Sequence, residues 1–525
     1  MNTKTFALVL AAGTASAAIA QIEPILYSDG PIPGVQTAGG DQATIWQTGL
    51  YRVRNSPDRS RWAIRVNQTS ASDNEYIVSG QGLTGTVVVN TSGEAGTVPA
   101  ASVDVFYISE RGLGINDDGL IALSGSTTAR ATTDAIWLIE PGVGATLIAE
   151  EENPAFQRPG GFGDFEVISG PTISNTGKIA FSETDGGSAR EEQAILWDPT
   201  DGFSELFGEF DDLDNVPGRF VQNIGTGEAN ALRGAVFFFE NDGEDPVVGV
   251  YGDLDGSTDD DNFFATRDEA TGDFSSIYRE GDTIAGQDII TQAGWVAPQG
   301  NTYAVPAGGF PPLATVFAVI NDEVVLREGG LVGGTIDGET WESQDVGFLI
   351  SPVVAVDQNA QGGYIVGGTT SNTETFEAGG SSGTTIVTKN QVIIYVAPDG
   401  TRTELVRVGD TVTVDVGGTP DERRIVTLNQ SDAQFAAYLD DTHLYFVAGT
   451  DDFAGTIPND LFARIALPGG CRADLDGDGE LTLFDFLAFQ NLFDSGDLAA
   501  DFDGDGSLTL FDFLAFQNEF DAGCP

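Results

Sequence analysis

The stretch Gly-Ile-Asn-Asp-Asp-Gly-Leu-Ile-Ala-Leu-Ser-Gly at residues 114–125 joins a polar turn to a short apolar run. A variable loop separates it from a second apolar run, Ala-Ile-Trp-Leu-Ile, at residues 135–139. The same order returns in Ile-Ser-Asn-Thr-Gly-Lys-Ile-Ala-Phe-Ser at residues 173–182 and in Ala-Ile-Leu-Trp-Asp at residues 194–198. Because Asn and Gly favour tight turns and the apolar runs have strand length, the pattern indicates repeated units of short β-strands.

Weaker copies of this unit occur along the rest of the chain. They read Trp-Ala-Ile-Arg-Val at residues 62–66, Arg-Gly-Ala-Val-Phe-Phe-Phe at 233–239, Gly-Tyr-Ile-Val-Gly-Gly-Thr at 363–369 and His-Leu-Tyr-Phe-Val-Ala-Gly at 443–449. A second signature, Arg-Glu-Gly-Asp at 279–282, returns as Arg-Glu-Gly-Gly at 327–330 and Arg-Val-Gly-Asp at 407–410. Each follows a β run, so we expect a turn that leads into the next strand.

Imperfect repeats of about 50–80 residues, each with about four short strands, are typical of β-propeller blades. For residues 21–468 we therefore predict an all-β fold, a β-propeller of about seven blades. One four-stranded sheet cannot bury both of its faces, whereas sheets stacked around an axis bury them, and ring closure protects the end blades. A pair of β-sandwiches, which also need regular short strands, is the alternative.

The composition limits the partners. The net charge of -57 comes from 80 acidic and 23 basic residues among 525. A surface this acidic repels nucleic acid and anionic membranes, so we expect neither as a partner. It favours solubility and the binding of divalent cations. Adaptation to salty surroundings, where counterions screen the self-repulsion, is the alternative cause of the acidity.

Residues 1–20 have the features of a signal peptide. Lys4 supplies the positive start, an Ala-rich apolar run follows, and Ala-Ile-Ala at residues 18–20 is a small-x-small cleavage site. We therefore expect a mature chain that starts near Gln21 and a secreted, extracellular or cell-surface-associated protein. No later segment reaches about 18 uninterrupted apolar residues, so no transmembrane segment is predicted.

Residues 469–525 form a separate unit in which two twelve-residue stretches repeat. They read Asp-Leu-Asp-Gly-Asp-Gly-Glu-Leu-Thr-Leu-Phe-Asp at residues 474–485 and Asp-Phe-Asp-Gly-Asp-Gly-Ser-Leu-Thr-Leu-Phe-Asp at 501–512. Residues 481–491 are identical to residues 508–518, which indicates internal duplication. Alternating Asp residues on a curled loop, with Gly at the sharp sixth position, supply the oxygens that Ca²⁺ takes.

Each loop is predicted to hold one Ca²⁺ ion. The predicted ligands are Asp474, Asp476, Asp478, the backbone carbonyl of Glu480 and Asp485 in the first loop, and Asp501, Asp503, Asp505, Ser507 and Asp512 in the second. Thr482 and Thr509, at the ninth position, would act through water. Two solvated acidic turns are the alternative.

A paired calcium-loop-plus-helix repeat at the C-terminus of an exported chain resembles a dockerin, here over about residues 471–525. Asp at the twelfth position and the lack of a helix before each loop are also dockerin-like. The resemblance implies docking to a cohesin-like or other surface-anchoring protein, often by carbohydrate-active proteins. Many dockerins carry a hydroxyl pair where this chain has Leu483-Phe484 and Leu510-Phe511. We therefore expect a partner other than an ordinary cohesin.

The segment after each loop has more apolar residues than one helix stripe needs. Seven apolar residues between Leu483 and Phe493 cover nearly the whole helical circumference. The surplus predicts an exposed, partner-binding patch that includes Leu483, Phe484, Leu510 and Phe511. A core shared with the propeller or with the twin helix is the alternative.

The two cysteines, Cys471 and Cys524, flank this unit. In an exported chain such a pair predicts a disulfide that closes the small domain. In the loop-entropy description the bridge contributes roughly 4 kcal/mol. Flanking cysteines also make the unit resemble the GC-type dockerin that serves as a terminal anchor.

No catalytic residues can be nominated. A phosphate-binding Gly-rich loop, an HExxH motif and a convincing Gly-x-Ser-x-Gly elbow are missing from the sequence, and the single histidine, His443, lies in an apolar run that predicts a structural role. Our first hypothesis is a non-enzymatic binding or structural protein anchored through its C-terminal unit. The alternative is a carbohydrate-active propeller, glycoside-hydrolysing or glycan-binding, that the C-terminal unit places on polysaccharide. This alternative is an analogy, because it rests on the carbohydrate-active proteins in which dockerins often occur.

Overall fold

The computed structural model describes most residues between Gln21 and Ala522. The longer stretches outside it are residues 1–20, 91–100, 185–191, 225–235, 240–246, 289–296, 308–316, 343–352, 429–436 and 452–458. In the C-terminal unit, residues 469–472, 474, 476–480, 496–499, 501, 503–507 and 523–525 also lie outside it, and further short stretches occur elsewhere.

Seven sheets of four to six strands follow one another along the described chain, and we number them as blades. Blade 1 contains β4 (Leu50–Asn55), β5 (Trp62–Asn67), β6 (Glu75–Gln81), β7 (Thr84–Asn90) and β8 (Ala101–Ser102). Blade 2 contains β9 (Val105–Ile115), β10 (Ile121–Thr127), β11 (Asp134–Glu140) and β12 (Gly144–Glu150). Blade 3 contains β13 (Val167–Ile173), β14 (Ile179–Thr184), β15 (Glu192–Asp198) and β16 (Gly202–Gly208). Blade 4 contains β17 (Val221–Ile224), β18 (Val236–Phe239), β19 (Val247–Leu254), β20 (Asn262–Arg267) and β21 (Phe274–Arg279). Blade 5 contains β24 (Ala297–Gln299), β25 (Thr302–Ala307), β26 (Phe317–Ile320) and β27 (Glu323–Arg327). Blade 6 contains β30 (Val353–Gln358), β31 (Tyr364–Thr369), β34 (Gln391–Val396) and β35 (Arg402–Arg407). Blade 7 contains β36 (Thr411–Val416), β37 (Thr419–Thr427), β38 (Ala437–Leu439), β39 (His443–Asp451), β40 (Asn459–Ala466) and β1 (Ile22–Tyr27).

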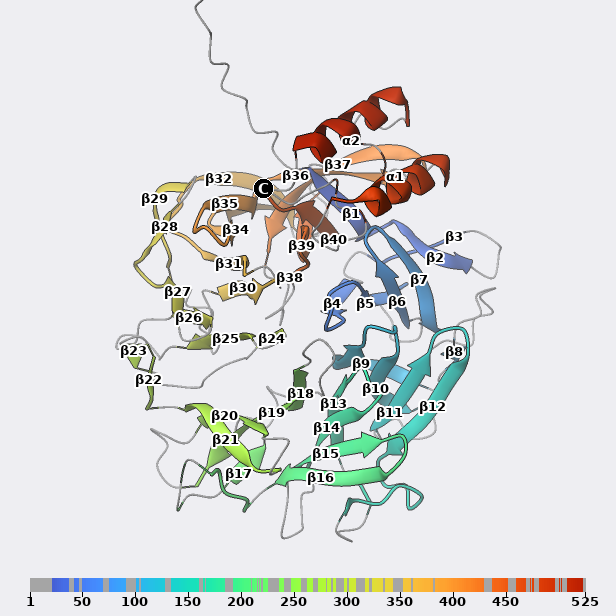
Figure 1. The fold of residues 1–525 in the computed structure, drawn as a ribbon, viewed down its shortest axis with the longest axis vertical. Helices are drawn as coiled ribbons and strands as arrows, with labels where there is room; N and C mark the ends of the chain where they lie inside the picture. The colour runs from blue at the N-terminus through green and yellow to red at the C-terminus, as the bar shows by residue number, and fades with distance from the viewer. Residues whose placement is uncertain are drawn as a thin grey trace, which may run out of the picture.

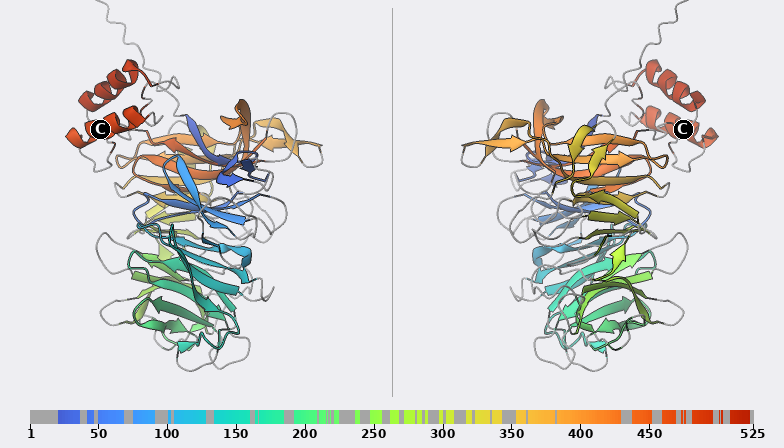
Figure 2. Two further views of the ribbon diagram at one scale, coloured as in Figure 1. Left: turned by 90° about the vertical axis from the view of Figure 1, so that its right-hand side faces the viewer. Right: turned by 90° about the vertical axis from the view of Figure 1, so that its left-hand side faces the viewer.

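The blades form a ring around a common centre (Figure 1). An inner strand of each blade contacts that of the next, in the order β4, β9, β13, β18, β24, β30 and β38, and β39 returns to contact β4. Side views show the sheets stacked one after another (Figure 2). The expected all-β propeller of about seven blades is therefore confirmed, and the pair of β-sandwiches is not the architecture.

The ring is closed by the first strand of the chain. β1 pairs antiparallel with β40, so that Ile22 lies opposite Ile465 and Tyr27 opposite Leu461. Strands from both ends of the propeller sequence thus share blade 7. This arrangement leaves no blade with an unpaired end face, which agrees with the physical reason for expecting a closed ring.

The core lies between the blades. One apolar cluster joins Ala63 and Ile77 of blade 1 to Leu123 and Trp137 of blade 2, and further clusters join blades 2 and 3, 6 and 7, and 7 and 1. Trp62 is fully buried at the last of these junctions and packs edge-to-face on Phe462, 5.2 Å away. A Cβ at Gly85 would lie only 2.3 Å from the Trp62 ring, so that position requires glycine.

The turn that connects the first two strands of a blade has a recurring hydrogen bond. A side-chain oxygen at the first turn position accepts the N–H of the residue just before the next strand. The pairs are Ser56 with Arg61 (3.1 Å), Asn116 with Leu120 (2.8 Å), Ser174 with Lys178 (3.0 Å) and Asn359 with Gly363 (2.9 Å). The Asn/Ser-x-x-Gly pattern is therefore the signature of three of these inner turns, and in the turn that begins at Ser56 the fourth residue is Arg59, with φ of 64°.

A second kind of turn follows the last strand of a blade. In the turns at residues 279–282 and 407–410 the Asp at the fourth position accepts the N–H of the first residue, at 2.8 Å in both. The third residues, Gly281 and Gly409, have φ of 88° and 109°. The expected role of the Arg-x-Gly-Asp signature as a turn is confirmed, and we call these the outer turns.

Four two-stranded hairpins supplement the blades. They are β2 (Pro31–Gln36) with β3 (Gln42–Thr44), β22 (Thr283–Ile284) with β23 (Gln287–Asp288), β28 (Leu331–Gly333) with β29 (Ile336–Thr340), and β32 (Thr375–Gly380) with β33 (Gly383–Thr388). The first three follow an outer turn directly. Ile32 and Val35 of β2 pack into the core of blade 1, and Val332 and Ile336 pack against blade 6, so these hairpins fasten one blade to the next.

Two helices, α1 (Leu483–Ser495) and α2 (Leu510–Ala522), end the described chain. They lie outside the ring, on the side where β1, β36 and β37 are found (Figures 1 and 2). Their core contains residues of the C-terminal unit alone.

Candidate functional site

The start of each C-terminal helix is built by the residues at positions nine and twelve of the predicted calcium loops. The Thr482 hydroxyl accepts the Phe484 N–H at 3.1 Å, and Asp485 accepts the Thr482 N–H at 2.7 Å. Thr509 and Asp512 repeat both bonds, at 3.1 and 2.6 Å. This reciprocal arrangement is a capping box, with Asp in place of the usual Glu.

Asp485 and Asp512 are fully buried. Asp485 also accepts the N–H of Leu475, at the second position of the same loop, at 2.8 Å. Each carboxylate therefore faces back into its own loop and away from solvent, as a ligand at the twelfth position would. The other predicted ligands, Asp474, Asp476, Asp478, Glu480, Asp501, Asp503, Asp505 and Ser507, lie outside the described residues, as do Cys471 and Cys524. Within the described part, no group of three or more His, Cys, Asp or Glu side chains could hold a metal.

The two helices share one aromatic core. Phe489 of α1 and Phe516 of α2 stack with ring centres 4.4 Å apart and an interplanar angle of 12°. Phe502 packs edge-on against both, at 5.6 and 5.2 Å. These three rings thus belong to a core that the twin helices share, as one alternative for the surplus apolar residues predicted. None of the three joins a core cluster of the propeller, which was the other alternative for a shared core.

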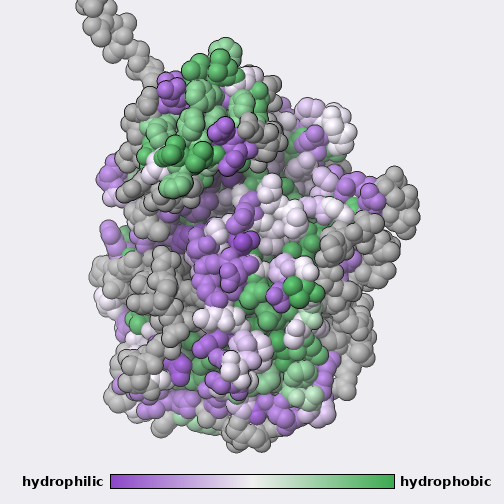
Figure 3. Space-filling view, turned by 45° about the vertical axis from the view of Figure 1, so that its right-hand side comes forward, coloured by the Kyte–Doolittle hydropathy of each residue, from purple (hydrophilic) through white to green (hydrophobic). Residues whose placement is uncertain are grey.

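The residues expected to bind a partner are exposed. Leu483 and Phe484 keep 68% and 67% of their surface in solvent, and Leu510 and Phe511 keep 69% and 66%. We call these four residues the Leu-Phe patch. Apolar side chains cover much of the C-terminal unit on the face seen in Figure 3, and the propeller surface below it carries both polar and apolar areas. Leu487 and Leu514, which are not among the four residues of the predicted patch, are also exposed and lie one turn further along each helix.

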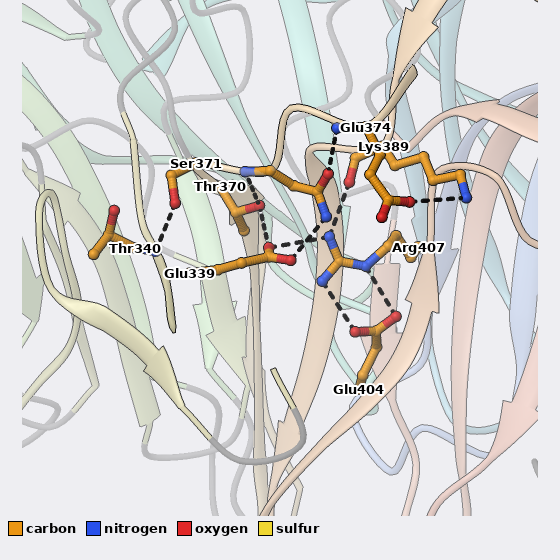
Figure 4. Close-up of polar contacts among 9 residues, drawn as sticks. Glu339, Thr340, Thr370, Ser371, Glu374, Lys389, Glu404 and Arg407 are labelled. Atoms are coloured by element: carbon orange, nitrogen blue, oxygen red, sulfur yellow. Dashed lines mark hydrogen bonds and ion pairs between the residues drawn. The ribbon is translucent and has the colours of Figure 1, made fainter. Parts of the chain in front are cut away.

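A polar constellation joins the β28–β29 hairpin to blade 6 (Figure 4). Glu339 at the end of β29 accepts hydrogen bonds from Thr370 (2.5 Å), Asn372 (2.8 Å) and Arg407 (3.1 Å). Arg407 also forms a two-pronged pair with Glu404, at 3.0 Å for both bonds. Sequence reasoning found Arg407 only as the first residue of an outer turn.

This constellation is a fastening and not a reactive centre. Burial raises the pKa of Glu339, but the hydrogen bonds from Thr370 and Asn372 and the Arg407 charge outweigh it and hold that pKa below its usual value. The Arg407 guanidinium also donates to the Lys389 carbonyl at 2.9 Å. Both charged groups are thus satisfied by protein partners, and the carboxylate stays ionised.

No helix in the part of the chain that the structure describes is long and apolar enough to cross a membrane. His443, at the start of β39, pairs its ring with the Thr442 hydroxyl at 2.7 Å. That contact, inside an inner turn, fits the structural role expected for this residue.

A family model described as "Family of unknown function (DUF7453)" matches residues 32–305. No curated protein matches the chain in sequence. Similar solved structures include the Dos1 propeller, with 9% identity over 85% of this chain and 95% of that chain and a TM-score of 0.32. The polysaccharide lyase Uly1 has 10% identity over 85% and 100% of the two chains and a TM-score of 0.33. AofleA from Arthrobotrys oligospora has 9% identity over 78% and 100% and a TM-score of 0.32.

Proposed function

Since this chain belongs to DUF7453, a family of unknown function whose model matches residues 32–305 of the propeller, we propose a role that rests on the chain's own residues. It is an exported β-propeller protein that is held at a cell surface or scaffold. The C-terminal unit is a dockerin-like anchor, and the Leu-Phe patch contacts a surface-anchoring protein with a complementary apolar surface.

The exposure of the Leu-Phe patch is the observation that carries this proposal. The small aromatic core of the unit is complete without these four side chains, which remain about two-thirds exposed. Burying a Leu or Phe side chain contributes roughly 1.5–3 kcal/mol, and clustered exposed apolar residues on a soluble protein usually mark a binding surface. A protein of net charge -57 has ample polar residues for its surface, so the duplicated apolar pairs point to a partner.

Calcium has a defined place in the proposal. The ligands would be the ten residues predicted above, with Asp485 and Asp512 closing the loops from the first turns of α1 and α2. A bound Ca²⁺ ion supplies the positive charge that lets several carboxylates converge on one loop. The two helix starts that carry the Leu-Phe patch would thereby be held in place, and a Cys471–Cys524 disulfide would close the unit.

The decisive experiment replaces both aromatic residues of the patch in the full-length exported protein. We expect Phe484→Asp with Phe511→Asp to release the protein from the surface fraction into the medium, with at least about a tenfold loss of retention, since two charged side chains would have to be desolvated at the contact. Treating surface-bound wild type with a calcium chelator should release it as well. Retention is measured by quantitative blotting of surface and medium fractions.

The matched control is Leu331→Asp with Ile386→Asp on the propeller. These residues are 68% and 62% exposed, so the control adds the same charge at equally exposed apolar positions. We expect it to be retained like wild type. A folded Phe484/Phe511 double variant that stays on the surface would refute the docking role, and a control variant that is also released would show that added charge alone accounts for the loss.

A further inference from the structure

The hairpin formed by β32 and β33 leaves one strand edge open. It is inserted between β31 and β34 of blade 6 and pairs without a bulge, from Thr375 opposite Thr388 to Gly380 opposite Gly383. In the part of the chain that the structure describes, β33 pairs with β32 alone, so no strand lies along its other edge. Such an edge is a ready template for a further strand.

The register shows which backbone groups lie along this edge. At the base of the hairpin the Lys389 N–H donates to the Glu374 carbonyl at 2.8 Å. Residues that point toward the partner strand and residues that point away alternate along an antiparallel ladder. The N–H and C=O groups of Thr384 and Ile386 therefore point away from β32, toward the open side of β33.

The outer edge of β32, in contrast, is closed by blade 7. The Gly379 N–H donates to the buried carboxylate of Asp451 at 3.1 Å. Arg424 donates to the Glu377 carbonyl at 2.6 Å and lies over the Phe376 ring, 4.0 Å from its centre. These contacts fix the hairpin against the propeller, so β33 presents a preformed edge.

The edge of β33 lacks the features that usually protect a free strand. Thr384, Thr385 and Ile386 are exposed, and residues 383–388 contain neither a charged residue nor a proline. The outermost strand of blade 1, β8, has only two residues, and the outermost strands of blades 2 to 7 all carry charge. Their charged residues include Glu150, Glu205, Arg279, Arg327, Glu404 and Asp415. Because charge and short length discourage edge-to-edge pairing, β33 differs from the blade edges in being suited to it.

We propose that β33 pairs antiparallel with β33 of a second copy of this chain. The three exposed residues are centred on Thr385, which sets the two-fold axis beside that residue. In this register Thr384 of one copy and Ile386 of the other exchange N–H···O bonds. The two Thr385 side chains face each other as a closely spaced, non-hydrogen-bonded pair, and Thr–Thr pairs in that position are favourable. The two hairpins thus form one four-stranded sheet.

Charge favours a second copy over a basic segment of another protein. The net charge of the chain is -57, but the charges beside the hairpin are paired, Lys389 with Glu374 at 3.3 Å and Arg424 with Asp451 at 3.1 Å. Within residues 375–388 only Glu377 is charged. A basic peptide therefore finds little excess negative charge here, whereas an identical uncharged strand meets no like charge along the edge. The two acidic molecules repel each other as wholes, and salt weakens that repulsion.

Analytical ultracentrifugation of the full-length exported protein, over a concentration series, tests the pair. We expect a dimer whose dissociation constant falls as the salt concentration rises. Ile386→Pro removes an outward N–H that the hairpin itself does not use, so the fold should be kept and the dissociation constant should rise at least about tenfold. Thr375→Pro is the matched control, because it makes the same change on the closed edge of β32, and it should dimerise like wild type.

Thr385→Cys tests the position of the axis. The Cα atoms of a non-hydrogen-bonded pair lie about 4.5 Å apart, which is within the range of a disulfide. Mild oxidation should therefore give a covalent dimer on a non-reducing gel, and Thr375→Cys on the closed edge should give none. Equal cross-linking of the two variants would overturn the proposed pairing.

Three further outcomes would also overturn it. The first is a wild type that stays monomeric at about 1 M ionic strength, where charges are screened within about 3 Å, since the edge would then be left to a strand of a different protein. The second is an Ile386→Pro variant with the dissociation constant of wild type. The third is a dimer that Phe484→Asp with Phe511→Asp abolishes, since the contact would then lie at the Leu-Phe patch. Each copy keeps its own C-terminal unit, so separating the pair leaves the proposed anchoring in place.

Discussion

The residue at the third position of each outer turn adopts a positive φ. Glycine fills it at Gly281, Gly329 and Gly409. At the corresponding place after β16, the turn at residues 208–211 has Phe210, with φ of 73°. Its fourth residue, Asp211, accepts the Gly208 N–H at 2.9 Å, as the Asp residues of the other turns do. The left-handed conformation of Phe210 therefore comes from the turn and not from the side chain, which is 59% exposed.

Replacing Phe210 by Gly should stabilise the protein. A non-glycine residue in this conformation costs roughly 1–2 kcal/mol, and the gain is reduced by the greater freedom of Gly in the unfolded chain. We expect a net gain of about 0.5–1 kcal/mol, seen as a higher midpoint in thermal unfolding. Phe210→Ala keeps the strain and removes the ring, so it should bring no gain. A stabilised Ala variant would show that the exposed ring and not the backbone is the source of the cost.

The outer turn and the hairpin after it act as one element. After the turns at residues 27–30, 327–330 and 407–410, the third residue donates its N–H to the carbonyl of Ile45, Trp341 or Ile425, at 2.8–2.9 Å. The same three residues donate back to the fourth turn residue at 2.8–2.9 Å. The chain is thereby directed over the next blade in the same way three times, and the Glu339–Arg407 constellation adds a charged fastening to the second of these hairpins.

Glu339→Gln should loosen the β28–β29 hairpin. Hydrogen bonds to a charged group contribute about 1.5–3 kcal/mol, and this carboxylate accepts three. Because the pKa of Glu339 is lowered in the folded protein, its contribution is present above the ordinary Glu pKa and is lost as the pH falls through the lowered value. At pH 7 we therefore expect faster amide exchange in residues 331–340 and a loss of about 1–3 kcal/mol of stability.

Glu374→Gln provides the comparison for this change. Glu374 pairs with Lys389 at 3.3 Å in the same constellation, but its side chain is 73% exposed. An exposed ion pair contributes little, about 0–1 kcal/mol. Equal effects of the two substitutions would contradict the idea that the buried hydrogen bonds of Glu339 fasten the hairpin.

For the whole molecule, closure of the ring depends on residues from both ends of the propeller. Buried Ile22 and Leu26 of β1 complete the cores of blade 7, and Glu23 pairs with Arg464 on β40 at 2.7 Å. Near the centre, buried Arg59 of blade 1 reaches Asp357 of blade 6 and donates to the Leu439 carbonyl of blade 7 at 3.0 Å. Burial raises the pKa of Asp357 despite the Arg59 charge.

A chain that starts at Ser28 lacks β1 and should lose the closed ring. The deletion exposes the edge of β40 and the apolar core residues that Ile22 and Leu26 cover, so we expect a lower and broader thermal transition and faster exchange in residues 459–466. A chain that starts at Gln21 is the control and should be unchanged. A synthetic peptide of residues 21–30 should restore the transition of the shortened chain by adding the missing strand. An undiminished transition without β1 would show that blade 7 is stable without it.

Features that depend on neighbouring residues could be predicted from the amino-acid sequence alone. The inner and outer turns, the strand-length apolar runs and the approximate number of blades are visible because Gly, Asn and Asp at fixed spacing and apolar runs report the local backbone. The two calcium-loop patterns and the expected exposure of the Leu-Phe patch are local in the same sense, since they arise from a duplicated stretch and a helix with surplus apolar residues.

Which of these local features meet depends on how the blades stack, and that is visible in the three-dimensional structure alone. Neither the pairing of β1 with β40 nor the contact of Gly379 with Asp451 follows from spacing, because each joins residues that are brought together by the stacking of whole blades. Phe210 shows the same limit, since it stands where the turns at residues 279–282, 327–330 and 407–410 have glycine. The conformation there is imposed by the bonds of Asp211 and the burial of Leu213 beside it, so packing overrides the local preference of the residue.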